Sequence, residues 1–214
     1  MTNKSSMVQV YIALGIIWLF HISALIGITL GYVDWFIEKT PLNLCICLVL
    51  FLWVYPIRSI RHVAAFLLFF IGGMLAEWIG VHYGILFGSY EYGANFGLKI
   101  DGVPYLIGAY WALLPFITAS VSDYFAKSRI AKIFIAATLM TLLDYFMEFN
   151  AHRFDFWEFE GGIASMQNYI TWFILALLFQ GILHYMKLIG NRLFSLNLYV
   201  AQFVFFVYLY FLEI

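Results

Sequence analysis

The sequence predicts an all-α protein: a polytopic bundle of about seven transmembrane helices, forming one integral membrane domain over residues 1–214. Of the 214 residues, 64% are hydrophobic and 11% are charged, whereas a soluble domain carries roughly 25% charged residues. A soluble fold of this length could not bury so much apolar surface in one core, but lipid solvates the outward faces of membrane helices. No linker rich in Pro, Gly or Ser divides the chain, and a net charge of −1 gives no basis for binding nucleic acid.

Seven apolar stretches have about the length that a helix needs to cross a membrane. About 30 Å of hydrocarbon takes roughly 20 helical residues, and six or eight spans would also fit the pattern. The second stretch is short and lies between Pro41 and Pro56, so we expect it to tilt little or to pair closely with a neighbour. The seven stretches are Val8–Val33, Pro41–Ile57, His62–Val81, Pro104–Val121, Ile130–Phe149, Tyr169–Leu188 and Leu193–Leu212.

Basic residues gather at the end of the predicted bundle that carries the N-terminus, which we call the basic end. It holds eight of the eleven Lys and Arg residues, and these residues are enriched in cytoplasmic loops. We therefore expect a multi-pass protein of the cell (inner) membrane with a cytoplasmic N-terminus and an external C-terminus. The eight are Lys4, Arg58, Arg61, Lys127, Arg129, Lys132, Lys187 and Arg192, and the other three are Lys39, Lys99 and Arg153.

Acidic residues gather at the opposite end of the bundle, the acidic end, whereas Asp123 alone lies at the basic end. Two segments at the acidic end, His82–Pro104 and Ala151–Asn168, mix glycine with aromatic and acidic residues. We expect these segments to form re-entrant or capping loops, and we place the working site beside them. The acids at this end are Asp34, Glu38, Glu91, Asp101, Asp155, Glu158, Glu160 and Glu213.

The two glycine-rich segments also carry a short internal similarity. Glu77 lies fourteen residues before Glu91, and Asp144 lies fourteen residues before Glu158. A duplicated helix–loop–helix unit would produce this spacing, as parallel repeats do in some transporters, and so would chance.

Three acidic residues fall within or near the apolar stretches, where ionisable groups are costly and are functional candidates. Glu77 is in the third stretch, and Asp144 and Glu148 share a helix face in the fifth because they are four residues apart. A neutral carboxylic acid can donate a proton, and a neighbouring carboxylate can accept one from water. This pair of functions suits the addition of water to an unactivated double bond. The alternatives are structural hydrogen bonds for Glu77 and Asp144 and a solvated interfacial acid for Glu148.

Other chemistries lack the residues that they need. The five histidines form no HxxxH or HxxHH run of the kind that membrane di-iron enzymes require, and no GxGxxG or P-loop phosphate site is present. Cys45 and Cys47 are expected to be packing residues. We therefore expect neither a metal nor a cofactor. Aromatic residues make up 21% of the chain, which suits a long conjugated ligand or a carbocation held by ring faces.

Two blocks of the sequence, Ala76–Trp111 and Leu143–Trp172, resemble the carotenoid biosynthesis proteins that include the carotenoid 1,2-hydratases. The resemblance is strongest over residues 72–179, and one departure is Phe149, which follows Glu148 where the family usually has proline. In the first block the matching residues are Glu77, Gly80, Gly84, Gly88, Tyr90, Tyr92, Gly102, Val103, Pro104 and Trp111. In the second block they are Asp144, Glu148, Phe156, Trp157, Asn168 and Trp172.

The resemblance implies a hydro-lyase that adds water, without a cofactor, to the terminal C1,2 double bond of an acyclic carotenoid and so forms a tertiary alcohol. The partners would be the carotenoid, lying among the third to sixth helices, and membrane lipid. We expect Asp144 or Glu77 to protonate C2 and Glu148 or Asn168 to orient the attacking water. The C1 cation would face Tyr90, Tyr92 or Trp157, and the expected substrate-binding residues are Tyr90, Tyr92, Trp111, Trp157, Asn168 and Trp172.

Two other functions are compatible with the same residues. A proton-coupled transporter or channel could use the carboxyl groups as a relay. Another carotenoid or isoprenoid enzyme, such as a cyclase or an isomerase, could use a buried acid while excluding water.

Overall fold

The computed structural model describes residues 6–55, 57 and 59–212, and within them it confirms an α-helical bundle with seven candidate membrane spans. The chain is a multi-pass membrane protein. Lys4, Pro56, Arg58 and Glu213, which entered the predictions above, lie outside the described residues. The helices are α1 (Met7–Thr29), α2 (Val33–Ile37), α3 (Thr40–Val54), α4 (Ile60–Tyr83), α5 (Tyr105–Ser122), α6 (Arg129–Ala151), α7 (Met166–Met186) and α8 (Arg192–Phe211).

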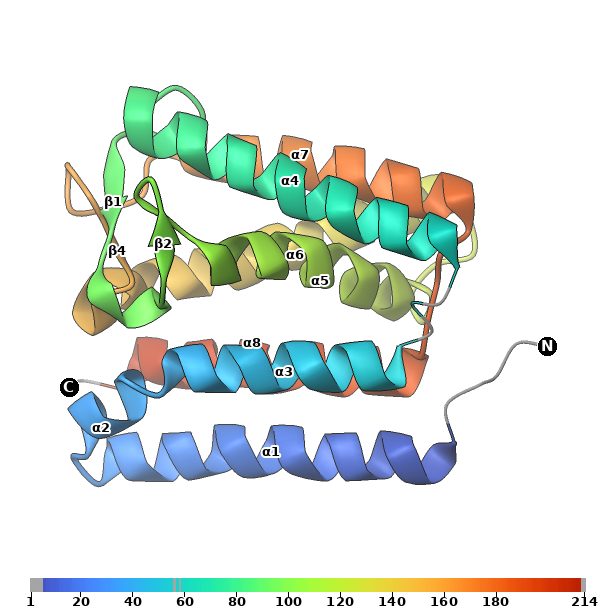
Figure 1. Ribbon diagram of the computed structural model, residues 1–214, viewed down its shortest axis with the longest axis horizontal. Coiled ribbons are helices and arrows are strands. Elements are labelled where there is room, and N and C mark those ends of the chain that lie inside the picture. Colours follow the sequence, from blue (N-terminus) through green and yellow to red (C-terminus); the bar gives the residue numbers. More distant parts are fainter. Residues whose placement is uncertain (1–5, 56, 58, 213–214) are drawn as a thin grey trace.

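The long helices run side by side, and the start of α1 lies at the opposite end of the bundle from the end of α8 (Figure 1). Helix α5 is the core helix, because 83% of its span is buried inside the protein, compared with 28–39% for the other spans. It packs against α3, α4, α6, α7 and α8. The other spans leave much of their apolar surface exposed, as expected for helices that face lipid.

The start of the bundle differs from the prediction. The first apolar stretch was expected to continue to Val33, but α1 ends at Thr29 and the chain turns at Gly31, whose φ of +92° favours glycine. A short helix, α2, follows, and α2 and α3 together make the second span. Pro41 lies in the first turn of α3, where a missing N–H is tolerated.

Small strands at the acidic end were not predicted. Strand β1 (Tyr90–Tyr92) pairs antiparallel with β4 (Trp157–Phe159), and β2 (Lys99–Ile100) pairs with β3 (Val103–Pro104). The 3₁₀ turns η1 (Ala94–Phe96) and η2 (His152–Phe154) complete these segments. These segments lie across the ends of the helices in Figure 1. They are therefore capping loops and not re-entrant loops. Strands of two or three residues are too short to give a clear alternating pattern.

The pairing of β1 with β4 bears on the internal similarity in the sequence. Glu91 lies directly opposite Glu158, and both are exposed, while Tyr90, Tyr92 and Trp157 are buried. Of the equivalent positions in the two segments, Glu91 and Glu158 are partners across the ladder, and the duplication itself stays a prediction. The alternation along each strand turns aromatic side chains toward the helices and the two acids outward.

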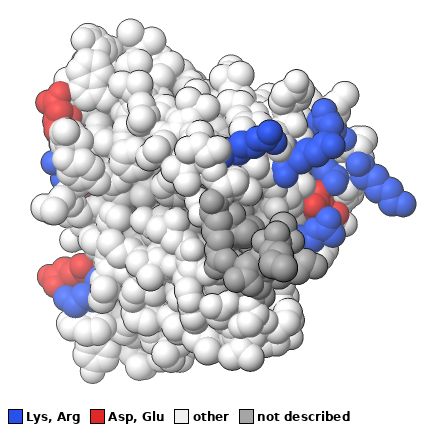
Figure 2. All heavy atoms as spheres, turned by 45° about the vertical axis from the view of Figure 1, so that its right-hand side comes forward, with Lys and Arg blue, Asp and Glu red and all other residues white. Residues whose placement is uncertain are grey.

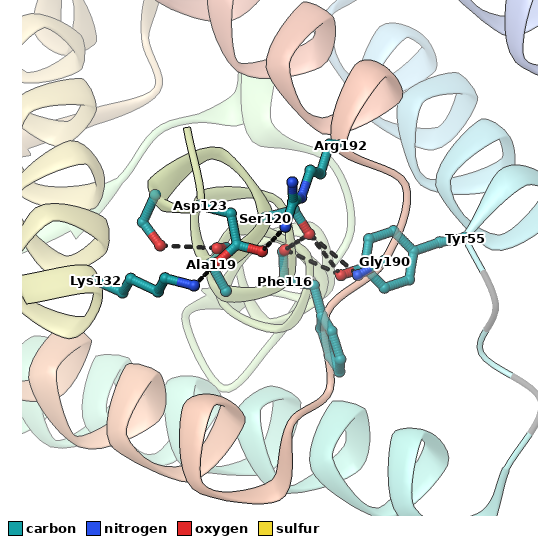
Figure 3. Close-up of polar contacts among 9 residues, drawn as sticks. Tyr55, Phe116, Ala119, Ser120, Asp123, Lys132, Gly190 and Arg192 are labelled. Atoms are coloured by element: carbon teal, nitrogen blue, oxygen red, sulfur yellow. Dashed lines mark hydrogen bonds and ion pairs between the residues drawn. The ribbon is translucent and has the colours of Figure 1, made fainter. Parts of the chain in front are cut away.

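The basic end is held together by polar contacts between helix ends. Asp123, just after α5, forms ion pairs with Lys132 of α6 and Arg192 of α8, and its side chain is only 2% exposed. The Tyr55 hydroxyl lies 3.0 Å from the Ser120 hydroxyl in the same region (Figure 3). Burial alone would raise the pKa of Asp123, but hydrogen bonds from the two cations outweigh burial and lower it. The space-filling view shows Lys and Arg gathered at this end (Figure 2).

Candidate functional site

The three carboxyl groups singled out in the sequence meet at the acidic end of the bundle. Glu77 of α4 and Asp144 and Glu148 of α6 line one small cavity of about 20 Å³. Eight of the nine predicted catalytic and substrate-binding residues line this cavity, and the ninth, Trp111, donates a hydrogen bond to Glu77. The eight are Glu77, Tyr90, Tyr92, Asp144, Glu148, Trp157, Asn168 and Trp172.

Glu77 is surrounded by hydrogen-bond donors. Its side chain is 3% exposed, and the hydroxyls of Tyr90 and Tyr92 both donate to Oε2, the latter at 2.8 Å. The indole Nε1 of Trp111 donates to Oε1 at 2.6 Å. Both carboxyl oxygens of Glu77 are therefore acceptors, the role that a carboxylate takes in charge-assisted hydrogen bonds.

Asp144 and Glu148 share one amide donor. The Nδ2 atom of Asn168 on α7 lies 3.2 Å from Asp144 Oδ2 and 3.0 Å from Glu148 Oε1. The indole Nε1 of Trp157 on β4 donates to Glu148 Oε2 at 2.7 Å. Asp144 is 2% exposed, and among the described residues Asn168 is its one side-chain donor. Asp144 thus has fewer partners than either glutamate.

The paired strands bring the donors to the carboxyl groups. Tyr90 and Tyr92 project inward from β1, and Trp157 projects inward from β4 at the position opposite Tyr92. Burial, followed by the nearby charge of Glu77, raises the pKa of Tyr90 and Tyr92 well above its usual value. Both phenols therefore stay protonated and remain available as donors to Glu77.

Glycine lets the helices approach closely at this point. A Cβ atom on Gly73 of α4 would lie 2.3 Å from the Cβ of Trp111 on α5. A Cβ atom on Gly80 would lie 2.8 Å from the Tyr90 hydroxyl oxygen. Any side chain at either position would therefore push away a residue that binds Glu77.

A second, larger cavity of about 270 Å³ adjoins the carboxyl groups. Asp144 and Trp172 line both cavities, together with Ile107 and Met147, so Asp144 lies where the two meet. The walls of the larger cavity are mostly apolar and aromatic, as in most small-molecule sites. Asp144 therefore borders the mostly apolar cavity on one side and the cavity lined by the carboxyl groups on the other.

The larger cavity is not where we expected the ligand. We placed it among the third to sixth helices, but α1, α2, α3, α5 and α8 supply most of the lining, with α6 and α7 contributing near Asp144. The physical reason is close packing between α4 and α5, where Cβ atoms on Gly73 and Gly108 would overlap Trp111 and Met74. This contact leaves no comparable space between those two helices.

Two tryptophans join the cavities. The rings of Trp111 and Trp172 stack with centroids 3.9 Å apart and planes inclined by 19°. Both line the larger cavity, and Trp111 also binds Glu77. The indole and phenol groups of Trp157, Tyr90 and Tyr92 donate hydrogen bonds to carboxyl groups, and the contact of their ring faces with the substrate stays a prediction.

Several lining residues were not singled out from the sequence. Phe87, Ile107, Met147 and Phe159 complete the small cavity, and as apolar residues in an apolar chain they give no distinguishing signal. In the larger cavity Tyr110 and Gln202 were also missed, although a glutamine inside an apolar stretch is a usable signal. Among the described residues no three His, Cys, Asp or Glu side chains converge on a point that could hold a metal ion.

Comparison with known proteins assigns the chain to a family. The sequence model of the carotenoid biosynthesis protein family matches residues 40–213, which include both resembling blocks and extend well beyond residues 72–179. No curated protein and no solved structure matches the chain. The matched segment contains all three carboxyl residues and every donor that binds them. The chain belongs to the carotenoid biosynthesis protein family.

Proposed function

We propose that this protein, which has a role in carotenoid biosynthesis, hydrates the terminal C1,2 double bond of an acyclic carotenoid. The observation that carries the proposal is the position of Asp144, which lies between an apolar cavity and a small cavity lined by two further carboxyl groups. Hydration of an alkene needs a proton donor, protection of the cation and one water molecule. The residues around Asp144 can supply each of these.

Asp144 is the better candidate for the proton donor. Glu77 accepts hydrogen bonds at both oxygens from Tyr90, Tyr92 and Trp111, which suits an ionised group. Asp144 has a single amide donor and lines the apolar cavity. In the proposed step the π electrons of the double bond take the proton of neutral Asp144, forming the C2–H bond and leaving a tertiary cation at C1.

The cation at C1 would be stabilised by aromatic faces and by negative charge. The stacked rings of Trp111 and Trp172 border the apolar cavity next to Asp144, and a cation over an indole face gains about 0.5–2 kcal/mol. The carboxylate of Glu77, which accepts a hydrogen bond from Trp111, would add electrostatic stabilisation at a point shielded from bulk water.

The small cavity would hold the attacking water. Its volume of about 20 Å³ is enough for one molecule, since a water needs roughly 10–15 Å³. The carboxyl oxygens of Glu77 and Glu148 provide acceptors for its hydrogens. The water oxygen would bond to C1 while Glu148 takes the released proton, and return of a proton to Asp144 completes the net addition of one water.

The cavity also limits how the substrate can bind. At about 270 Å³ it is smaller than a whole carotenoid, and ligand pockets commonly measure roughly 300–1,000 Å³. It would therefore hold the end group to be hydrated, with the rest of the polyene extending toward lipid.

Pigment analysis tests the proposal. The chain would be expressed in a host that accumulates lycopene or γ-carotene. The pigments would be separated, and their molecular masses would be measured by mass spectrometry. We expect a product heavier by one water from the wild type and none from Asp144→Asn or Glu77→Gln. Normal product from both variants would overturn the scheme, and a new pigment of unchanged mass would indicate a cyclase or an isomerase instead.

A further inference from the structure

The larger cavity has a second polar region away from the carboxyl groups. Gln202 of α8 lines this cavity and is 5% exposed. Its Nε2 donates to the Tyr110 hydroxyl at 3.0 Å, but its Oε1 is buried without a hydrogen-bond partner among the described residues. An unpaired buried acceptor costs roughly 1–3 kcal/mol. Oε1 has almost no accessible surface, so the amide must turn toward the cavity before a ligand can donate to it, and that pairing would remove the cost.

His21 of α1 adds a second acceptor to the same cavity. Its ring is 3% exposed, and Nδ1 lies 2.8 Å from the carbonyl oxygen of Ile17. A carbonyl oxygen only accepts, so Nδ1 carries the hydrogen and Nε2 of the neutral ring is an acceptor. The imidazole also packs edge-on against Phe205, about one helical turn beyond Gln202 on α8.

The polar region lies at about the same membrane depth as Asp144. Two hydrogen bonds join α1 to α8, each between residues 179 positions apart, and two join the α6 region to α8 with a separation of 56. Residue 21 plus 179 and residue 144 plus 56 both give position 200. His21 and Asp144 therefore lie at the same height along the bundle as Val200 of α8. Gln202 is two residues further along α8, which corresponds to about 3 Å at 1.5 Å per residue.

We propose that Gln202 and His21 form a subsite that binds the hydroxyl group of a hydroxylated carotenoid end group in the larger cavity. The hydroxyl hydrogen would be donated to one of the two acceptors. A hydroxyl also accepts, so it fits Gln202 even if the amide is turned to present Nε2. Tyr110 holds the amide in place from α5.

The inference rests on the proposed function for the class of ligand. Hydration turns an apolar end group into a tertiary alcohol inside a cavity whose walls are mostly apolar. A buried hydroxyl without a partner costs free energy, so the product needs a polar wall at the depth of the reaction. The subsite supplies one, and the cavity is then a binding site for the alcohol as well as for the alkene.

A binding measurement on the purified full-length protein in detergent tests the subsite. The two probes are a lycopene derivative reduced at both terminal C1,2 double bonds and the same molecule with a hydroxyl at C1. Neither has the bond to be hydrated, so the result does not depend on the proposed reaction. Affinity is read from quenching of tryptophan fluorescence by the polyene.

We expect the wild type to bind the hydroxylated probe roughly five- to tenfold more tightly, as one or two net hydrogen bonds would give. Gln202→Leu should lose most of the preference, keeping only what His21 gives, whereas Gln180→Leu, at a buried glutamine outside the cavity, should keep the full preference. If Gln202→Leu does not fold, Tyr110→Phe, which frees the amide, should reduce the preference. Equal affinity in the wild type, or an unchanged preference in the variant that folds, would overturn the proposal.

Discussion

The indole N–H of Trp111 donates a 2.6 Å hydrogen bond to the carboxyl group of Glu77, across the contact between α5 and α4. The same ring stacks on Trp172 and borders the larger cavity. A single side chain therefore fixes a buried carboxyl group and offers its face to the ligand. Hydrogen bonds to charged groups contribute about 1.5–3 kcal/mol, which is large enough to measure. A substitution that keeps the aromatic ring but removes the N–H tests this contact separately.

Trp111→Phe keeps an aromatic ring and removes the donor. We expect product formation to fall by roughly ten- to a hundredfold, because one acceptor of Glu77 loses its partner. Trp18→Phe is the matched control, since it removes an indole donor to Asn197 between α1 and α8. Initial rates in isolated membranes, normalised to protein, measure the effect. Equal loss in both variants would show that Trp111 acts only through folding.

Asn168→Leu removes the amide that binds Asp144 and Glu148. Leucine has a similar volume, so the expected result is a folded protein with product formation lower by roughly a hundredfold or more. Asn197→Leu on α8 is the control. Thermal unfolding in detergent and pigment analysis would be measured together, and an active Asn168→Leu variant would remove the amide from the mechanism.

Gly73→Ala tests the close approach that positions Trp111. The added Cβ would lie 2.3 Å from the Trp111 Cβ, so α4 and α5 must separate, at a cost of about 1–3 kcal/mol. Gly181→Ala on α7 is the control, because nothing lies within 4 Å of its Cβ position. We expect Gly73→Ala to lose stability and activity together and Gly181→Ala to keep both. Wild-type activity in Gly73→Ala would mean that the site tolerates a displaced Trp111.

The ion pairs of Asp123 at the basic end should make the stability of the protein depend on pH. Lys132 and Arg192 lower the pKa of Asp123, so its contribution is complete above the usual value of about 3.8 and is lost as the pH falls through the lowered value. We expect Asp123→Asn to reduce the free energy of unfolding by about 1–3 kcal/mol at neutral pH. This value lies between those typical of exposed and of buried ion pairs.

That difference should shrink as the pH falls from the usual carboxyl pKa to below the lowered pKa of folded Asp123, because Asp123 is then protonated in both states. Asp34→Asn, at an acid near the other end of the bundle, is the control and should have little effect at any pH. A difference between wild type and Asp123→Asn that persists unchanged at low pH would show that the ion pairs do not contribute.

The acids of the site could be predicted because an ionisable residue in an apolar stretch is costly. Glu77 and Asp144 were found in this way, and the four-residue spacing added Glu148. The resemblance then supplied Tyr90 and Tyr92. Each of these signals is local in the sequence, and the structure brings their residues together.

The relation between distant segments could not be predicted. The pairing of β1 with β4 decides that Tyr92 and Trp157 act as donors to carboxyl groups, and strands this short carry almost no pattern. The larger cavity depends on how α1, α3 and α8 pack. Their apolar residues are equally suited to facing lipid or a ligand, so composition does not distinguish the two.

The source of the product oxygen tests the central claim most directly. Membranes containing the protein would be supplied with an acyclic carotenoid in water labelled with the heavy oxygen isotope. The molecular mass of the product alcohol would be measured by mass spectrometry. Hydration at the carboxyl site predicts one labelled oxygen per new hydroxyl from the wild type and no product from Asp144→Asn. An unlabelled hydroxyl, or labelled product formed at the wild-type rate by Asp144→Asn, would contradict the account.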